Sequence, residues 1–335
     1  MRINSQPLLQ IRERINQAMK NKECQSTGHK SKIGGQALIE GVMMRGIDKA
    51  AMSVRLPDGS IDTESWEVGS LNRAWYHKMP IVRGVVNFIG SMITGYRCMM
   101  KSAEKAGMED DFEGEPSKFD LWLEKHLGEH MMKIVGVVAM VFGIALALVL
   151  FMFLPALAVK GIQLLFDPGI FKSLIEGLIK IIIFVLYLAL VSRMKEIKRV
   201  FGYHGAEHKS IACYEAGEEL TVENVRKHTR FHPRCGTSFI LIVLVIGILV
   251  FSVVTWSSLW MRVVLKLALL PVVMGVAYEI IKLAGRYDNV VTRIISAPGL
   301  WLQRLTTNEP DDSQIEVAVA ALTAVLPDNK EEDQW

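Results

Sequence analysis

Four long apolar runs constrain this chain more than any other feature, because each is long enough to cross a lipid bilayer. A transmembrane helix needs about 20 predominantly apolar residues. The runs cover residues 134–154, 174–191, 238–254 and 263–284. They give the 335-residue chain a mean hydropathy of +0.26 although 22% of its residues are charged. We therefore predict a mainly α-helical, polytopic integral membrane protein with four transmembrane helices, an interfacial helix and a small cytoplasmic α+β element.

The basic residues orient the predicted spans. The loop 192–237 holds nine lysines and arginines, whereas the loops 155–173 and 255–262 hold two and one. Lysine and arginine are enriched in cytoplasmic loops. We therefore predict a multi-pass protein of the bacterial inner membrane, with both termini and the loop between the second and third spans in the cytoplasm.

The chain divides into six segments by composition. A loose tail and an N-terminal region containing a β-hairpin and an amphipathic helix precede the first membrane pair. A cytoplasmic His/Cys loop separates it from the second pair, and a cytoplasmic C-terminal region follows. The corresponding residues are 1–30, 31–130, 131–192, 193–237, 238–285 and 286–335.

The N-terminal region holds three local signals. Strands over 51–56 and 61–68 flank the turn Pro57-Asp58-Gly59. The glycine-rich stretch 33–46 predicts a tight bend beside the membrane, with an anion or substrate site as the alternative. Residues 79–106 have helical periodicity, but Arg83 makes a spanning helix costly. We therefore favour an interfacial helix, since a span here would reverse the location of everything upstream.

Two further helices are predicted after the last span. Residues 286–305 favour a surface helix, and the acidic segment at Asp311 precedes a short capped helix over 315–322. Two acidic residues at membrane depth are candidates for supporting a site. Glu279 either pairs with Lys282, or supports a metal ligand through a hydrogen bond, or is itself an extra ligand, and Glu40 is a weaker candidate of the same kind.

A histidine cluster lies in the loop between the second and third predicted spans. Four of the eight histidines fall within residues 204–232. The order His-x-x-Glu-His at 204–208 places two histidines on one helical face. Zinc peptidases with an inverted signature use this order, with two histidine ligands and a glutamate that activates water. His228, His232 and Cys235 could complete the ligand set, and Cys213 and Glu215 are further candidates.

Three interpretations of the cluster stay open. In the first interpretation the metal is catalytic, with an open position for water and Glu207 as the general base. Alternatively it is structural, with two cysteines and two histidines closing a tetrahedral site. In the third interpretation no metal binds, and the side chains cap helices or contact lipid phosphate.

Several motifs resemble the YqhQ-type membrane proteins of bacteria. They are GGQALIEGVMMRG, MPIVRGVVNF, YHGAEHK, RFHPRCGTSF and TTNEPDDSQIEVAVAAL, and the resemblance covers about residues 30 to 325. That family is catalogued as predicted metal-dependent enzymes of unknown function. The resemblance implies a bacterial inner-membrane protein with a metal site at His204, Glu207, His208, His228, His232 and Cys235.

We predict a zinc-dependent hydrolase at the cytoplasmic face of the membrane. His204 and His208 bind zinc, His228 or His232 is the third ligand, Cys235 is a further ligand candidate, and Glu207 is the base. The alternative is a non-catalytic scaffold whose structural metal holds the loop for a membrane or cytoplasmic protein partner. Membrane lipids are expected partners. The near-neutral formal charge of +3 gives no support to nucleic-acid binding.

Overall fold

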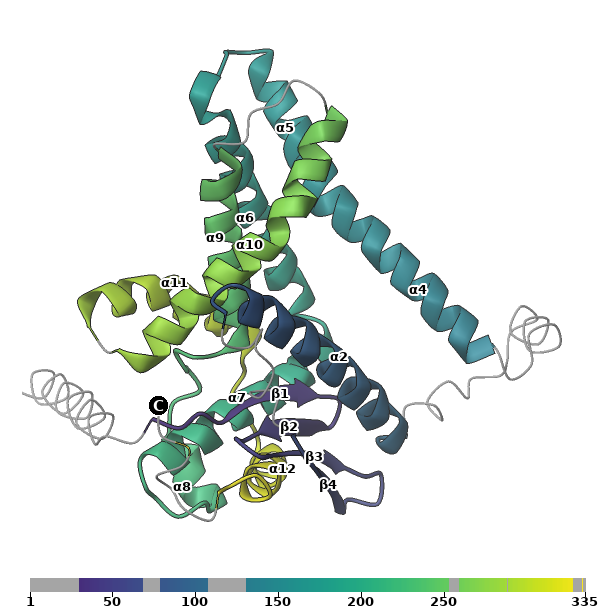
Figure 1. The fold of residues 1–335 in the computed structure, drawn as a ribbon. Coiled ribbons are helices and arrows are strands. Elements are labelled where there is room, and N and C mark those ends of the chain that lie inside the picture. Colours follow the sequence, from purple (N-terminus) through teal and green to yellow (C-terminus); the bar gives the residue numbers. More distant parts are fainter. Residues whose placement is uncertain are drawn as a thin grey trace, which may run out of the picture.

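A computed structural model describes residues 30–68, 79–107, 131–252, 259–287 and 289–327, together with residue 333. The fold is mainly helical with one small antiparallel sheet, as predicted. Figure 1 shows two parts: a bundle of long apolar helices, and at one end of it a sheet with shorter helices packed against it. The predicted loose tail lies outside the described residues.

The sheet is a four-stranded meander in the order β1-β2-β3-β4, formed by Gly34–Leu38, Gly41–Arg45, Lys49–Arg55 and Ile61–Glu67. Strands β3 and β4 form the predicted hairpin. The glycine-rich stretch, where we expected a bend, forms the β1-β2 hairpin, and Glu40 sits at its turn with a φ of 50°. Glu40 pairs with Arg199 and accepts a hydrogen bond from Tyr203, so it ties the hairpin to a helix.

Helices α7 (Lys195–Glu215) and α12 (Asp312–Thr323) pack against this sheet, and α8 (Val222–Lys227) packs against both of them. Helix α12 begins at a capping box in which Asp311 and Gln314 exchange hydrogen bonds between side chain and backbone. Its apolar face shares one core with β1–β3 and α7, whose fully buried members include Val42, Ala51, Tyr203, Ile315 and Leu322. Segments nearly 300 residues apart in the sequence therefore form one body.

Among the described residues, three helical stretches are long and apolar enough to cross a membrane: Met140–Gln163, Lys172–Val191 and Val264–Ala284. The first joins α4 (Met131–Leu148) to α5 (Leu154–Gln163) through a π-helical turn, Val149–Phe153. The second is α6, and the third lies within α10 (Leu259–Arg286). Most of their apolar side chains face outward, as lipid contact requires.

The prediction of four full-length spans is wrong. Within the described residues the run 238–254 forms α9, Gly236–Ser252, an apolar helix of 17 residues. At 1.5 Å per residue it is about 26 Å long, against a hydrocarbon core of about 30 Å. The predicted run held the same number of residues, so it was already shorter than the about 20 that a span needs, and its last two residues lie outside the described part of the chain.

Helix α2, Val82–Lys105, confirms the predicted amphipathic helix and is not among the candidate spans. Its exposed apolar face includes Ile89, Met92 and Ile93. Arg83 of α2 donates to Glu279 of α10 at 2.6 Å from Nε. The partner of Glu279 is therefore Arg83 rather than the predicted Lys282 or a metal.

Helix α11, Val290–Thr306, confirms the predicted surface helix and begins at an Asn289 capping box. Figure 1 shows it at the junction between the long helices and the sheet. One face buries Leu302, Gln303 and Thr306, and the other exposes Val290, Val291, Ile294 and Trp301.

Gly205 of α7 should resist substitution although it lies inside a helix. Replacing a helical glycine by alanine usually stabilises by about 1 kcal/mol. At Gly205 a Cβ would lie 2.0 Å from the backbone oxygen of Asn308, so the chain between α11 and α12 would have to move. We expect Gly205→Ala to lower the thermal unfolding midpoint, whereas the control Gly90→Ala on α2, where nothing lies within 4 Å, should raise it slightly. Equal midpoints for the two variants would contradict this packing.

Candidate metal centre

Helix α7 supplies the first part of the site. His204 and His208 lie four residues apart, so both project from one face, and their ring centroids are 4.5 Å apart. His208 is only 1% exposed and Glu207 4%. The helix therefore buries three polar side chains, and each of them requires a partner.

Two backbone carbonyls fix the orientation of the histidines. Nδ1 of His204 lies 2.7 Å from the carbonyl oxygen of Thr306, and Nδ1 of His208 lies 2.6 Å from that of Arg230. A carbonyl can only accept, so each Nδ1 carries the hydrogen. The Nε2 atoms are thereby presented as possible ligands, which is the usual arrangement of metal-binding histidines.

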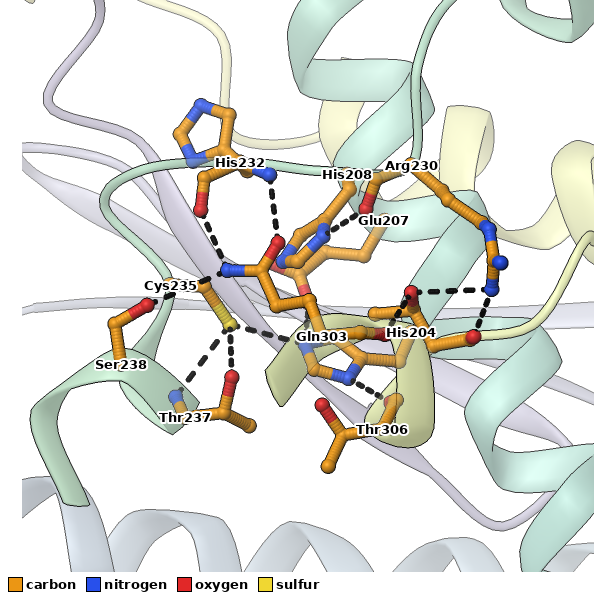
Figure 2. Close-up of polar contacts among 11 residues, drawn as sticks. His204, Glu207, His208, Arg230, His232, Cys235, Thr237, Ser238, Gln303 and Thr306 are labelled. Atoms are coloured by element: carbon orange, nitrogen blue, oxygen red, sulfur yellow. Dashed lines mark hydrogen bonds and ion pairs between the residues drawn. The ribbon is translucent and has the colours of Figure 1, made fainter. Parts of the chain in front are cut away.

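Cys235 faces these two rings from the segment before α9 (Figure 2). Its Sγ lies 3.2 Å from Nε2 of His204 and 3.2 Å from the hydroxyl oxygen of Thr237. One ligand atom each from His204, His208 and Cys235 lies within 4.8 Å of the others. Nε2 of His208 is buried and makes no hydrogen bond within the described part of the chain. We call these three residues the His2Cys cluster.

The electrostatics favour a thiolate at Cys235. Burial alone would raise the pKa of this thiol, but His204 and His208 outweigh burial and hold the pKa well below its usual range. Burial alone would likewise lower the pKa of His204, yet the neighbouring Cys235 raises it to about 9. Thiolate and imidazole are donors that Zn²⁺ prefers. The donor set of the cluster therefore fits a zinc ion.

Glu207 lies beside the cluster without belonging to it. Its carboxylate is 4.0 Å from Nε2 of His204. Burial raises its pKa, opposed by His208, His204 and the backbone of Gly35 on strand β1. A Cβ on Gly35 would lie 2.9 Å from the Glu207 side chain, so this close approach requires glycine. The glycine-rich hairpin thus forms one wall of the site.

His232 lies next to the cluster and has other partners. Its ring centroid is 5.6 Å from that of His208. Its Nε2 is 3.8 Å from Glu215 and 3.1 Å from Arg234, which also pairs with Glu215. Burial lowers the pKa of His232, only partly opposed by Glu215. Burial would also raise the pKa of Glu215, but His232 and Arg234 lower it to about 2.

His228, the remaining predicted ligand, lies with Cys213 and Glu218 rather than with the His2Cys cluster. Glu215 accepts hydrogen bonds from the backbone and hydroxyl of Ser31, so it anchors the chain leading into β1. The residues predicted as one ligand set therefore lie in two groups in the structure.

Three contributors to the site escaped sequence reasoning. The roles of the Thr306 and Arg230 carbonyls could not be predicted, because every residue has a backbone carbonyl whatever its side chain. Gln303 of α11 accepts from the backbone N–H of His232 at 2.8 Å and donates to its carbonyl at 2.7 Å, which fixes the segment before Cys235 (Figure 2). A single glutamine in an amphipathic helix does not indicate such a role. Gly35 is a fourth contributor, and the glycine-rich stretch of the sequence did point to it.

The fold and the cluster define a class: a mainly helical protein whose described part holds three helices able to span a membrane and a group of His and Cys side chains that could hold a metal ion. Residues 79–328 match a family described as a protein of unknown function, DUF1385, and the chain belongs to this family. It is 35% identical over 300 residues to the uncharacterized protein YqhQ of Bacillus subtilis (strain 168), covering 88% of this chain and 92% of that protein. The resemblance to YqhQ-type proteins is thereby confirmed. No solved structure matches.

Proposed function

We propose that this protein is a zinc-dependent hydrolase at the cytoplasmic face of the bacterial plasma membrane. His204, His208 and Cys235 are its metal ligands, and Glu207 is its general base. One observation carries the proposal: the two histidines and the sulfur of Cys235 offer ligand atoms close to one another, while a buried carboxyl group lies beside them. Catalytic zinc sites have three protein ligands and keep a fourth position for water or substrate.

The zinc ion would supply Lewis acidity, lowering the pKa of a bound water and polarising a substrate carbonyl or phosphoryl group. The chain supplies the rest. Glu207 accepts the proton of the attacking water and returns it to the leaving group. The Gly35 backbone orients the Glu207 carboxylate. The Thr306 and Arg230 carbonyls keep each imidazole in the tautomer that leaves Nε2 available.

The placement of α11 supports a substrate that comes from the membrane. The Thr306 carbonyl and the Gln303 side chain, both on α11, hold His204 and the segment of His232. The opposite face of the helix exposes large apolar side chains, including Ile294 and Trp301. An amphipathic helix of this kind lies in the bilayer interface. We propose membrane lipids as partners and a lipid head group or membrane-tethered peptide as substrate.

The packing of the sheet against α7 and α12 supports the proposed topology. The sheet, α7 and α12 share one core, so they lie on one side of the membrane, and an even number of crossings separates α7 from α12. We infer that α9, although shorter than the usual thickness of the hydrocarbon core, crosses together with α10, and that both termini are cytoplasmic. A cysteine at position 167, between α5 and α6, should then react with a membrane-impermeant maleimide added to intact cells. Reaction of Asp167→Cys only after lysis would contradict this topology.

The burial of the cluster favours the second candidate, a non-catalytic scaffold. His208 and Cys235 are 1% and 7% exposed, as expected for a closed structural site. In this alternative the metal fixes the loop for a membrane or cytoplasmic protein partner. The two candidates differ in whether water is consumed.

Isotope-labelled water distinguishes them. Purified protein is incubated with membrane vesicles in H₂¹⁸O, and lipids and peptides are analysed by mass spectrometry. A hydrolase yields ¹⁸O-labelled products that disappear on chelation. If zinc-loaded protein yields no labelled product above the chelated control, the hydrolase proposal fails and the scaffold remains.

A further inference from the structure

A second group of metal-type donors lies at the C-terminal end of α7. Cys213 is fully buried there, Glu218 follows the end of the helix, and His228 caps the C-terminus of α8. One ligand atom from each lies within 4.8 Å of the other two. The backbone brings them together: the N–H of Glu218 bonds to the carbonyl of Cys213, and Gly217 turns the chain with a φ of 73°.

The ligand atoms of the three side chains lie close to one another. Nε2 of His228 lies 3.3 Å from the Glu218 carboxylate, and this buried nitrogen has no hydrogen-bond partner among the described residues. Sγ of Cys213 contacts a backbone carbonyl, that of Glu219, at 3.6 Å. A histidine–glutamate ion pair alone would not require a thiol within reach. Thiol, imidazole and carboxylate together are the three donor types that Zn²⁺ uses in proteins.

We propose that Cys213, Glu218 and His228 bind a second divalent transition-metal ion, with zinc as the expected occupant. This site is distinct from the His2Cys cluster and shares no ligand with it. Coordination removes the proton of the thiol, which burial otherwise retains by raising the pKa of Cys213 to about 11. The proposal does not depend on whether the first site is catalytic.

The second site would fix one end of the segment that completes the first. The chain runs from His228 through Arg230, whose carbonyl orients His208, to Cys235. A metal at His228 joins the start of this segment to α7, and the His2Cys cluster joins its end to the same helix. The expected role of the second ion is therefore structural, holding α8 and the connecting segment against α7.

Metal content of the full-length protein tests the proposal. Protein purified in detergent is loaded with Zn²⁺, desalted and analysed by elemental mass spectrometry. We expect two equivalents per chain in the wild type, and one in each of Cys213→Ser, His228→Ala and Cys235→Ser. Glu223→Gln, which replaces an exposed carboxylate of α8, is the matched control and should keep two. The double variant Cys213→Ser/Cys235→Ser should bind none.

Cobalt substitution distinguishes loss of one site from misfolding of the protein. Each proposed site has one thiolate ligand, so a band that remains in a variant shows that the other site is intact. Cys213→Ser should retain the thiolate-to-cobalt charge-transfer band of Cys235, at about half the wild-type intensity. One equivalent in the wild type, unchanged in Cys213→Ser, would overturn the second site and leave the first intact. Loss of zinc only in Cys235→Ser would have the same meaning. Two equivalents in Cys213→Ser would place the second ion elsewhere.

Discussion

Glu207→Gln should keep the metal and the fold but reduce hydrolysis by about 10²- to 10⁴-fold, the usual contribution of a general base. Glutamine has the size of glutamate and can still meet the backbone of Gly35, but it cannot accept the proton of water. The carboxylate lies beside the His2Cys cluster without being one of its three members, so its loss leaves the donors in place. The measurement is the initial rate of ¹⁸O-labelled product formation.

Glu196→Gln is the matched control, since this carboxylate is exposed in the first turn of the same helix. Its rate and its zinc content should equal those of the wild type. If Glu207→Gln retained full activity with full zinc content, Glu207 would not be the base. A loss of zinc in this variant would instead make Glu207 a ligand.

His208→Ala should remove one metal equivalent and all metal-dependent activity. The imidazole is 1% exposed, and its Nε2 has no hydrogen-bond partner within the described ranges, so a bound ion would satisfy it. Binding to the native state alone stabilises it by about 4 kcal/mol when free metal exceeds Kd 1,000-fold. The variant loses that stabilisation and also leaves a cavity, so its thermal midpoint in excess zinc should fall.

A second comparison isolates the metal contribution. The wild type should lose stability when a chelator is added, whereas His208→Ala should respond less, because one of its ions is already absent. Cys98→Ala, which changes a buried cysteine of α2 that belongs to neither group of metal-type donors, should respond like the wild type. Equal responses of His208→Ala and the wild type to the chelator would show that His208 holds no ion.

Features with a local cause were predictable from the sequence. Continuous apolar runs identified α6 and the span within α10, and Pro57-Asp58-Gly59 identified the hairpin of β3 and β4. Helix α12 followed from its cap at Asp311. The four-residue spacing of His204 and His208 placed both on one helical face, as the structure shows.

Features that depend on distant parts of the chain were not predictable. The start of α9 is set where the segment of Cys235 turns into the helix, which hydropathy does not mark. His228 lies near His232 in the sequence, yet α8 carries it toward Cys213. The contact of Gly35 with Glu207 joins residues 172 positions apart, so only the folded chain shows why this position requires glycine.

X-ray absorption spectroscopy of the zinc-loaded Cys213→Ser variant tests the central claim, the His2Cys metal centre, most directly. With the second site removed, the zinc shell should contain two nitrogen scatterers at about 2.0–2.1 Å and one sulfur at about 2.3 Å, with a remaining light scatterer for the open position. Replacing Cys235 as well should abolish the sulfur signal together with zinc binding. A zinc shell without sulfur in Cys213→Ser would contradict the assignment of Cys235 and with it the proposed centre.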